Sequence, residues 1–372
     1  MEVYENCSLK GLSTFGIDAR ARRHVVMEPG DDIGALCSMV DGRLLVLGRG
    51  SNMVFTRDFD GTVVTLADVQ HLTFDYEQST VTAWGGMVMD DLVRLTLEQG
   101  LYGLENLSAI PGTVGASAVQ NVGAYGAEAK DFIEIVEAYD LQERCRCTFS
   151  NAECLFAYRD SLFKHHAGRY IILYVTYRLH GEFVPNLSYK ALEGMPHATA
   201  EELREAITGL RWSKLPRPEE HGSAGSFFKN PVVDEATYLG LREEYPDMPQ
   251  AHNTPLPPSW GDGLVSSRGD GFVSSKGGEV PSKGDGFVSS SSPLEGGRGV
   301  NPGYKLSAGW LIDKAGWKGR TMGKAGVWPK NALVLYNAGG CTGKEVVALA
   351  EAIVADVREK FGITLLPEAV IV

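Results

Sequence analysis

The chain has 372 residues, of which 44% are hydrophobic and 22% are charged, a composition typical of a globular protein with roughly two or three domains. Lys and Arg number 35 against 47 Asp and Glu, so the formal charge is −12, and without a long basic stripe we expect no nucleic-acid partner. The start lacks the pattern of a secretory signal, no apolar run is long enough to span a bilayer, and the six cysteines lack zinc-site spacing. We therefore expect a cytoplasmic protein with no membrane partner and no bound metal.

Residues 1–66 are expected to form a small α/β unit. The apolar run Arg43–Leu47 predicts a strand that leads into Gly48-Arg-Gly-Ser-Asn52. A glycine-rich turn after a strand leaves backbone N–H groups free to contact a phosphate or a ribityl chain, although many α/β turns share the pattern. Val63–Leu66 predicts a further strand.

Residues 67–213 are expected to form an α+β unit with many strands and few helices. Asp90–Gln99 has helical spacing with an acidic start, and Gly100 is placed to end the helix. Apolar and alternating runs predict strands at Thr80–Trp84, Ile133–Leu141, Arg144–Phe149 and Tyr170–Leu179.

The stretch from Asn106 to Gly126 is the densest in small residues, with glycines at 112, 115, 123 and 126. Such a run is either a tight packing turn or a backbone cradle for an anion. It has no charged side chain before Glu128, and it carries Gln120, Asn121 and Tyr125. We interpret it as a cradle for the pyrophosphate of a cofactor.

Two further segments carry polar residues in unusual surroundings. Arg159 stands beside Tyr158 among aromatic residues, as either a buried cation that faces an anion or part of a surface loop packed by Phe156 and Phe163. Ser226 lies among small residues but lacks a Gly-x-Ser-x-Gly elbow, so it is a poor candidate for a hydrolase nucleophile and could instead donate a proton.

Residues 214–362 are expected to form a third unit, which opens with the proline-rich Lys214–Pro218. The sequence predicts a helix within 304–319, a strand at Ala332–Tyr336, and a helix from a capping box at Thr342 to Gly362. The last ten residues, 363–372, predict a strand that carries Glu368 and returns to the first unit.

Residues 255–302 interrupt the third unit with three copies of Gly-Asp-Gly-(Leu/Phe)-Val-Ser-Ser. This Gly- and Ser-rich composition cannot bury a core, so we expect a disordered insertion. Calcium-binding repeats also use Gly and Asp, but one Asp in each copy gives too few ligands.

Taken together, six short motifs in this order resemble the UDP-N-acetylenolpyruvoylglucosamine reductase family, over nearly the whole chain except about 255–302. They are Leu47-Gly-x-Gly-Ser-Asn52, Ile110-Pro-Gly-Thr-Val-Gly115 with Gln120-Asn-Val-Gly-Ala-Tyr-Gly126, Tyr158-Arg-Asp-Ser-x-Phe-Lys164, Ala224-Gly-Ser-Phe-Phe-Lys-Asn-Pro231, Ala308-Gly-Trp-Leu-Ile-Asp313 and the terminal Glu368. The resemblance implies an α+β fold: a two-part FAD-binding region of the vanillyl-alcohol-oxidase type (1–66 joined by 363–372, then 67–213) and a separate α/β substrate-binding domain (214–362).

The resemblance also implies the chemistry. The family uses NADPH and a non-covalent FAD to reduce UDP-N-acetylglucosamine enolpyruvate for peptidoglycan synthesis, and we expect a monomer. It implies that Ser226 donates a proton, that Arg159 and Glu368 stabilise an enolate, and that Tyr158 orients the carboxylate. The implied flavin contacts are Gly48, Gly50, Ser51, Asn52, Pro111, Gly112, Gly115, Ser117, Asn121 and Gly123. The implied substrate contacts are Tyr125, Tyr189 (in a tyrosine loop that closes over the sugar nucleotide), Lys214, Asn230 and Lys305.

One departure and two alternatives remain open. Where the family tends to place a substrate tyrosine, after Tyr245-Pro-Asp-Met-Pro, this chain has Ala251, which cannot stack, and His252 follows it. The alternatives are a flavin oxidase or dehydrogenase of the same fold with another substrate, and a non-catalytic protein that binds flavin or a nucleotide sugar.

Overall fold

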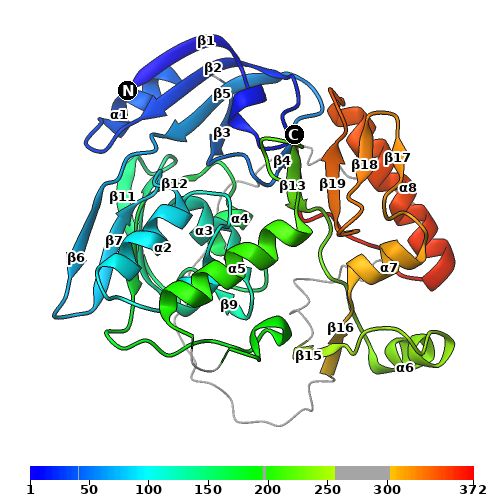
Figure 1. Cartoon of the computed structure of the whole chain (residues 1–372). Helices are drawn as coiled ribbons and strands as arrows, with labels where there is room; N and C mark the ends of the chain where they lie inside the picture. The colour runs from blue at the N-terminus through cyan, green and yellow to red at the C-terminus, as the bar shows by residue number, and fades with distance from the viewer. Residues whose placement is uncertain (41, 196–197, 256–301) are drawn as a thin grey trace, which may run out of the picture.

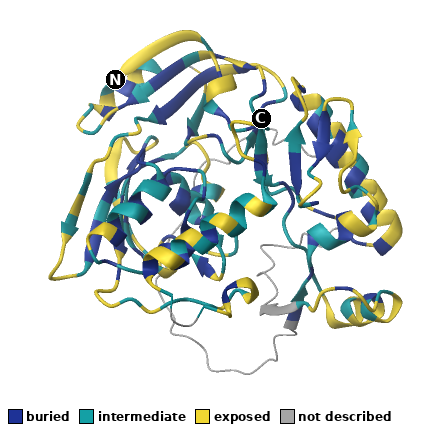
Figure 2. Ribbon diagram, viewed as in Figure 1, coloured by how far each residue is buried: buried dark blue, intermediate teal, exposed yellow. Residues whose placement is uncertain are grey.

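A computed structural model describes residues 1–40, 42–195, 198–255 and 302–372. The predicted insertion at 255–302 falls almost wholly outside the described residues. The described residues form three sheets of four or five strands and three smaller sheets. The buried residues concentrate on the inner strands and on the helix faces that cover them (Figures 1 and 2).

The first unit is a four-stranded sheet of order β1-β2-β5-β3. Strand β1 runs antiparallel to β2, whereas β2 and β3 both run parallel to β5. The end of the chain joins this unit, because β20 pairs in parallel with β4. The elements are β1 (Glu2–Ser8), η1 (Lys10–Leu12), β2 (Arg20–Met27), α1 (Ile33–Met39), β3 (Arg43–Leu47), β4 (Met53–Val54), β5 (Phe59–Leu66) and β20 (Val370–Ile371).

The second unit is an antiparallel five-stranded sheet of order β11-β10-β12-β7-β6, and Figure 1 shows α2, α3 and α5 on one side of it. Trp84 and Leu173 share a buried cluster with Val25 and Val64, so the first two sheets pack on each other. The elements are β6 (Leu72–Asp75), β7 (Thr80–Trp84), α2 (Met89–Glu98), η2 (Glu105–Leu107), α3 (Val114–Gln120), β8 (Gly123–Ala124), β9 (Ala127–Glu128), η3 (Ala129–Asp131), β10 (Ile133–Asp140), β11 (Cys145–Ser150), α4 (Leu162–His165), β12 (Tyr170–Arg178), η4 (Lys190–Leu192) and α5 (Ala200–Lys214).

The third unit has a four-stranded sheet of order β13-β19-β18-β17, covered by α8, and a smaller sheet of order β14-β16-β15. Its core is continuous with that of the first unit, because Phe15 and Phe55 lie in the same buried cluster as Phe227 and Val346. The elements are β13 (Ser223–Ser226), β14 (Val232–Val233), α6 (Glu235–Glu244), β15 (His252–Pro255), β16 (Pro302–Lys305), α7 (Ala308–Lys314), β17 (Thr321–Met322), β18 (Ala325–Val327), β19 (Val334–Asn337) and α8 (Gly343–Phe361).

The sequence predictions are correct for the α+β class and for most of the regular elements. Two predictions are wrong. Residues 304 and 305 belong to β16, because they pair with β14 and β15, and helix α7 begins only after its cap Ser307. Of the predicted strand 363–372, only β20 is a strand, because Glu368 and Ala369 both direct their N–H groups at the carbonyl of Phe227 and not into a regular ladder.

Candidate active site

A single ion pair joins the second unit to the end of the chain. The Nε of Arg159 donates to Oε1 of Glu368 at 3.0 Å, and the Nη2 of Arg159 donates to the carbonyl of Gly123 at 2.5 Å. Both side chains are largely buried, with 17% and 14% of their surface exposed. Within the described residues, Nη1 of Arg159 has no acceptor and Oε2 of Glu368 has no donor. The pair therefore keeps one donor group and one carboxylate oxygen available to a ligand.

The backbone that carries Arg159 is held in a rare conformation. Ala157 and Asp160 exchange two backbone hydrogen bonds, so Tyr158 and Arg159 form the tip of a two-residue turn. Arg159 has a φ of +55°, in the left-handed region that residues with a Cβ seldom adopt. The Nδ2 of Asn121, itself left-handed at +42°, donates to the carbonyl of Ala157 and supports the turn. Strained residues of this kind concentrate at functional sites.

Glu368 is pinned from two sides although only four residues follow it. Its N–H donates to the carbonyl of Phe227 at 2.7 Å, and its own carbonyl accepts from Nδ2 of Asn52 at 3.0 Å. Phe227 directly follows Ser226, the last residue of β13. Glu368 is therefore paired with Arg159 through its side chain and held through its backbone beside the segment that carries Ser226.

The aromatic ring of Tyr158 makes cation–π contacts with two basic side chains. Lys305 Nζ lies 4.1 Å from the centre of its ring, and Arg159 Cζ lies 5.1 Å from it. Burial raises the pKa of Tyr158, while burial and the nearby Arg159 lower the pKa of Lys305. Asn230 accepts from the N–H of Ala308 at 3.0 Å, and its side chain counteracts part of the effect of burial on the pKa of Tyr158. These side chains form a positively charged, partly dry surface suited to an anionic ligand.

A second group of predicted substrate residues lies beside the glycine-rich stretch. Tyr125 and Tyr189 meet edge to face, with ring centres 5.1 Å apart, and Lys214 Nζ donates to the hydroxyl of Tyr189 at 3.1 Å. Asn106 ties the two segments together by donating to the carbonyls of Tyr125 and Asn186. The tyrosine loop is thus docked directly on the stretch that carries Tyr125.

Sequence reasoning missed Arg211 in this group. Burial lowers the pKa of Arg211 and the neighbouring Tyr125 opposes this shift, while Nε of Arg211 is buried without a hydrogen-bond partner among the described residues. Helix α5, on which it stands, was not predicted, although Thr199 and Glu202 form a capping box at its start.

The two glycine-rich turns of the predicted phosphate cradle contact each other. The hydroxyl of Ser51 donates to the carbonyl of Pro111 at 2.8 Å, and a Cβ on Gly48 would lie 3.1 Å from Oγ1 of Thr113. The backbone N–H groups of Ser51, Asn52, Gly112 and Thr113 have no acceptor among the described residues. A concave row of free N–H groups fits the pyrophosphate of a dinucleotide cofactor.

Other members of the predicted flavin set have different neighbours. The hydroxyl of Ser117 bonds to the carbonyl of Val114 and to the hydroxyl of Tyr177, inside the core. The side chain of Asn121 is fully buried and supports the turn at Ala157, Gly115 packs on β12, and Gly123 packs on Arg159. These four residues therefore support the segments that carry the site. The side chains of Ser117 and Asn121 both face other parts of the protein.

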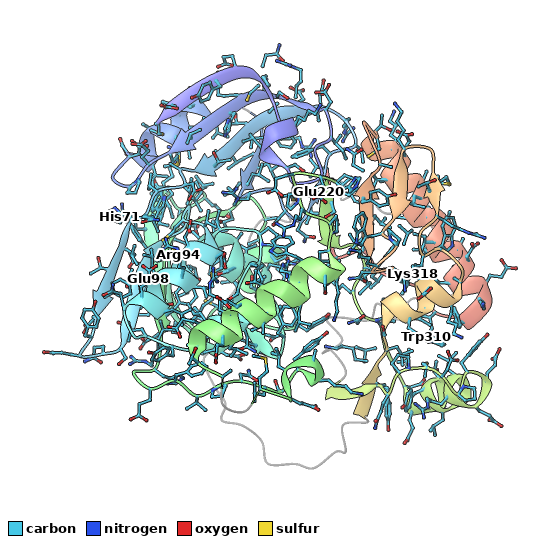
Figure 3. The ribbon with its side chains drawn as sticks, viewed as in Figure 1. His71, Arg94, Glu98, Glu220, Trp310 and Lys318 are labelled. Carbon is cyan, nitrogen blue, oxygen red and sulfur yellow. The ribbon has the colours of Figure 1, made fainter. Side chains whose placement is uncertain are left out.

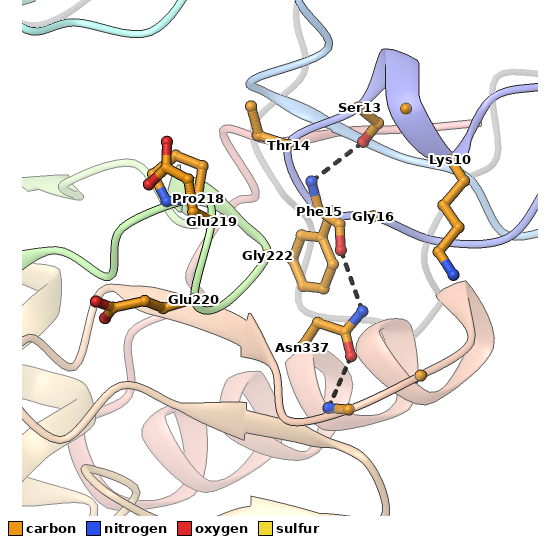
Figure 4. Close-up of a pocket in the computed structure, with 13 residues that line it drawn as sticks. Lys10, Ser13, Thr14, Phe15, Gly16, Pro218, Glu219, Glu220, Gly222 and Asn337 are labelled. Carbon is orange, nitrogen blue, oxygen red and sulfur yellow. Dashed lines mark hydrogen bonds between the residues drawn. The ribbon is translucent and has the colours of Figure 1, made fainter.

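A separate crevice lies between the first and third units (Figure 4). It has a volume of about 500 Å³ and is lined by parts of residues 10–16, 218–222 and 337–340. Asn337 bridges it, donating to the carbonyl of Phe15 at 3.2 Å and accepting from the N–H of Gly339. None of the predicted site residues lines it, so it is not the candidate active site.

Comparison with known proteins decides the family. The pattern of an FAD binding domain matches residues 31–144, and that of the UDP-N-acetylenolpyruvoylglucosamine reductase C-terminal domain matches residues 217–372. The chain is 40% identical to UDP-N-acetylenolpyruvoylglucosamine reductase of Pseudomonas aeruginosa, over 99% of this chain and 98% of that protein. The chain belongs to the UDP-N-acetylenolpyruvoylglucosamine reductase family. The resemblance seen in the sequence motifs is therefore confirmed, and the chain is a flavin-dependent oxidoreductase.

Two further relatives agree. The reductase of Burkholderia ambifaria is 41% identical, over 98% of this chain and 95% of that protein. A crystal structure of UDP-N-acetylenolpyruvylglucosamine reductase from Thermus caldophilus has a TM-score of 0.61 and 22% identity, and it covers 100% of this chain and 98% of that one. At this identity the structural likeness shows the fold alone.

Three further predictions concern Ala251, membrane-spanning helices and metal sites. Ala251 is partly buried and packs against the core of the third unit, so its methyl group belongs to the packing. In the part of the chain that is described, no helix is long and apolar enough to cross a membrane. Among those same residues, no three His, Cys, Asp or Glu side chains are grouped to hold a metal ion.

Proposed function

We propose that the chain reduces the enolpyruvyl group of UDP-N-acetylglucosamine enolpyruvate to the lactyl ether of UDP-N-acetylmuramate, with NADPH as the reductant, for peptidoglycan synthesis. The observation that carries this proposal is the Arg159–Glu368 pair, with one donor and one oxygen left open beside β13. A carboxylate-bearing substrate needs such a group, and the family of the chain supplies the identity of that substrate.

The cradle formed by residues 48–52 and 111–113 would hold the pyrophosphate of FAD, which when bound carries hydride from NADPH to the methylene carbon of the enolpyruvyl group. Hydride addition to that carbon leaves negative charge on the neighbouring carbon and the carboxylate. The planar guanidinium of Arg159, already fixed by Glu368 and Gly123, would stabilise this enolate with little reorganisation. Glu368, the ion-pair partner of Arg159, would hold this guanidinium in position against the same group.

The enolate must then take a proton, and Ser226 would supply it. The hydroxyl of Ser226 has no hydrogen-bond partner among the described residues, so it is free to face a ligand. A serine is a weak acid, so its proton transfer requires positive charge to stabilise the alkoxide that remains, and Arg159 and Lys305 would supply that charge.

The nucleotide end of the substrate would lie against the tyrosines. Lys214 and Tyr189 offer a cation and a hydroxyl for the diphosphate, and Tyr125 offers a ring edge for the sugar. Asn230 and Lys305, next to Tyr158, would bind between the two ends.

The test is product formation by the FAD-loaded protein. With NADPH and UDP-N-acetylglucosamine enolpyruvate, we expect a product heavier than the substrate by two hydrogen atoms and equimolar oxidation of NADPH. NADPH oxidation that depends on another acceptor would favour the flavin oxidase or dehydrogenase alternative. Bound flavin and bound substrate without turnover would favour the non-catalytic alternative.

A further inference from the structure

Lys164 is a half-buried cation whose ammonium group lies beside Arg159 and Gln120. Its Nζ donates to the carbonyl of Arg159 at 2.8 Å and to Oε1 of Gln120 at 2.9 Å. Among the described residues, no carboxylate oxygen lies within ion-pair distance of this nitrogen. A partly buried charge without a counterion is costly, so its position calls for an explanation beyond general stability.

The first of these contacts acts on the strained turn. Arg159 holds a left-handed backbone at a φ of +55°, and the bond from Lys164 fixes the carbonyl that follows this angle. Ser161 completes the anchor, because its hydroxyl bonds to the carbonyl of Val119 on α3 and caps the helix that carries Lys164. The direction of the Arg159 side chain therefore depends on the ammonium of Lys164.

The second contact of Lys164, to Gln120, links it to Glu368. Gln120 accepts from Lys164 through Oε1, which orients its amide so that Nε2 points at Oε1 of Glu368, 3.4 Å away. The same oxygen accepts from Nε of Arg159. Both members of the pair are thus tied to a single ammonium group, one through its backbone and the other through Gln120.

We propose that Lys164 is a positioning residue for the reduction, whose charged ammonium holds Arg159 and Glu368 in the geometry that binds the substrate carboxylate. This inference rests on the proposed function and names a group that neither the family comparison nor the sequence motifs assign to a role. Charged donors make stronger hydrogen bonds than neutral ones, so loss of the charge loosens both contacts.

The surroundings of Lys164 place its loss of charge in an accessible pH range. Burial, together with the neighbouring cations Lys229 and Arg159, lowers its pKa to about 8, against opposition from Asp160 and Glu368. The ammonium is therefore charged below about pH 8 and neutral above it. The substrate-driven step is expected to slow as the pH rises through this value.

The experiment compares the wild type with Lys164→Arg and Lys164→Met. FAD on each protein is reduced with dithionite without oxygen, and the rate at which UDP-N-acetylglucosamine enolpyruvate reoxidises it is measured from pH 6.5 to 9.5. For the wild type we expect a fall centred near pH 8. Lys164→Arg stays charged throughout, so we expect a rate that falls little over this range. Lys164→Met is expected to be slower at pH 7 by on the order of 10²-fold, with no fall near pH 8.

Two measurements separate positioning from folding. FAD content and the urea midpoint are determined for each variant, and Lys318→Met is the matched control, since Lys318 pairs with the exposed Asp313 on the third unit (Figure 3). If Lys164→Met does not fold, the pH profiles of the wild type and Lys164→Arg still test whether the charge of Lys164 controls the rate. An unchanged fall near pH 8 in Lys164→Arg, or no fall in the wild type, overturns the inference.

The result also distinguishes this inference from the proposed function. If reduced wild-type protein is not reoxidised by the substrate at any pH, the proposed function fails. If it is reoxidised and the variants match the wild type, only the role of Lys164 fails.

Discussion

The N–H of Glu368 donates a 2.7 Å hydrogen bond to the carbonyl of Phe227, the residue after Ser226. This bond places the terminal acid on the segment that carries the proposed proton donor, and a second bond, from Asn52 to the carbonyl of Glu368, ties both to the glycine-rich turn of the first unit. The proposed cradle for the cofactor and the proposed groups for the substrate are thus linked by hydrogen bonds.

Replacing Ser226 with alanine should separate the two halves of the reaction. Reduction of bound flavin by NADPH should be nearly unchanged, because it needs no proton from this hydroxyl. Reoxidation by the enolpyruvyl substrate should slow by about 10²- to 10⁴-fold, the usual contribution of a general acid. Stopped-flow absorbance measures both steps, with Ser223→Ala, at the other end of β13, as the control. Equal losses in both steps would refute the proton-donor role.

Arg159→Lys should retain a positive charge but lose the paired contacts to Glu368 and Gly123. A lysine cannot present a planar guanidinium, so we expect kcat/KM for the enolpyruvyl substrate to fall by about 10²- to 10³-fold. FAD content should stay at the wild-type level. Steady-state kinetics check this, and a variant with wild-type kcat/KM would show that charge alone suffices.

Gly50→Ala should impair the cradle. Gly50 has a φ of +59°, and a Cβ there would lie 2.2 Å from the carbonyl oxygen of Leu12, so the turn must move. We expect loss of bound FAD, measured by absorbance after gel filtration. Gly100→Ala is the matched control: its φ is +68° but nothing lies within 4 Å of the added Cβ, so it should cost only about 1–2 kcal/mol and keep FAD.

The pair of Asp90 and Arg204 should stabilise the docking of α5 in a pH-dependent way. Burial alone would raise the pKa of Asp90, but the bonds from Arg204 and from the N–H of Ala109 outweigh it, and the net pKa lies below its usual value. The contribution of the pair is therefore complete above the unfolded-state pKa near 4 and is lost as the pH falls through the lower folded-state value.

Arg204→Leu should accordingly lower the free energy of unfolding at pH 7 by about 1–3 kcal/mol. The difference from the wild type should shrink as the pH is lowered towards 3. Urea unfolding at several pH values measures it, with Arg94→Leu on the exposed face of α2 as the control (Figure 3). A difference that stays constant with pH would contradict this account.

Local patterns were sufficient for much of the fold, and the resemblance of six motifs was sufficient for the family. Strand β7 and helix α8, with its capping box and Gly362 stop, follow from alternation and capping signals alone. The contacts of the site could not be predicted in this way, because Arg159 and Glu368 are 209 residues apart and meet through tertiary packing. For the same reason small-residue density located the glycine-rich stretch but could not show that Ser117 faces the core.

The proposed function requires that this chain passes hydride to the enolpyruvyl group of a UDP-sugar. The most direct measurement reduces the bound flavin with NADPH in the absence of oxygen, adds UDP-N-acetylglucosamine enolpyruvate, and follows the absorbance band of oxidised flavin. We predict rapid return of the band with formation of UDP-N-acetylmuramate. A flavin that stays reduced while the substrate is bound would contradict the claim, and would indicate a working cofactor site joined to a domain made for another acceptor.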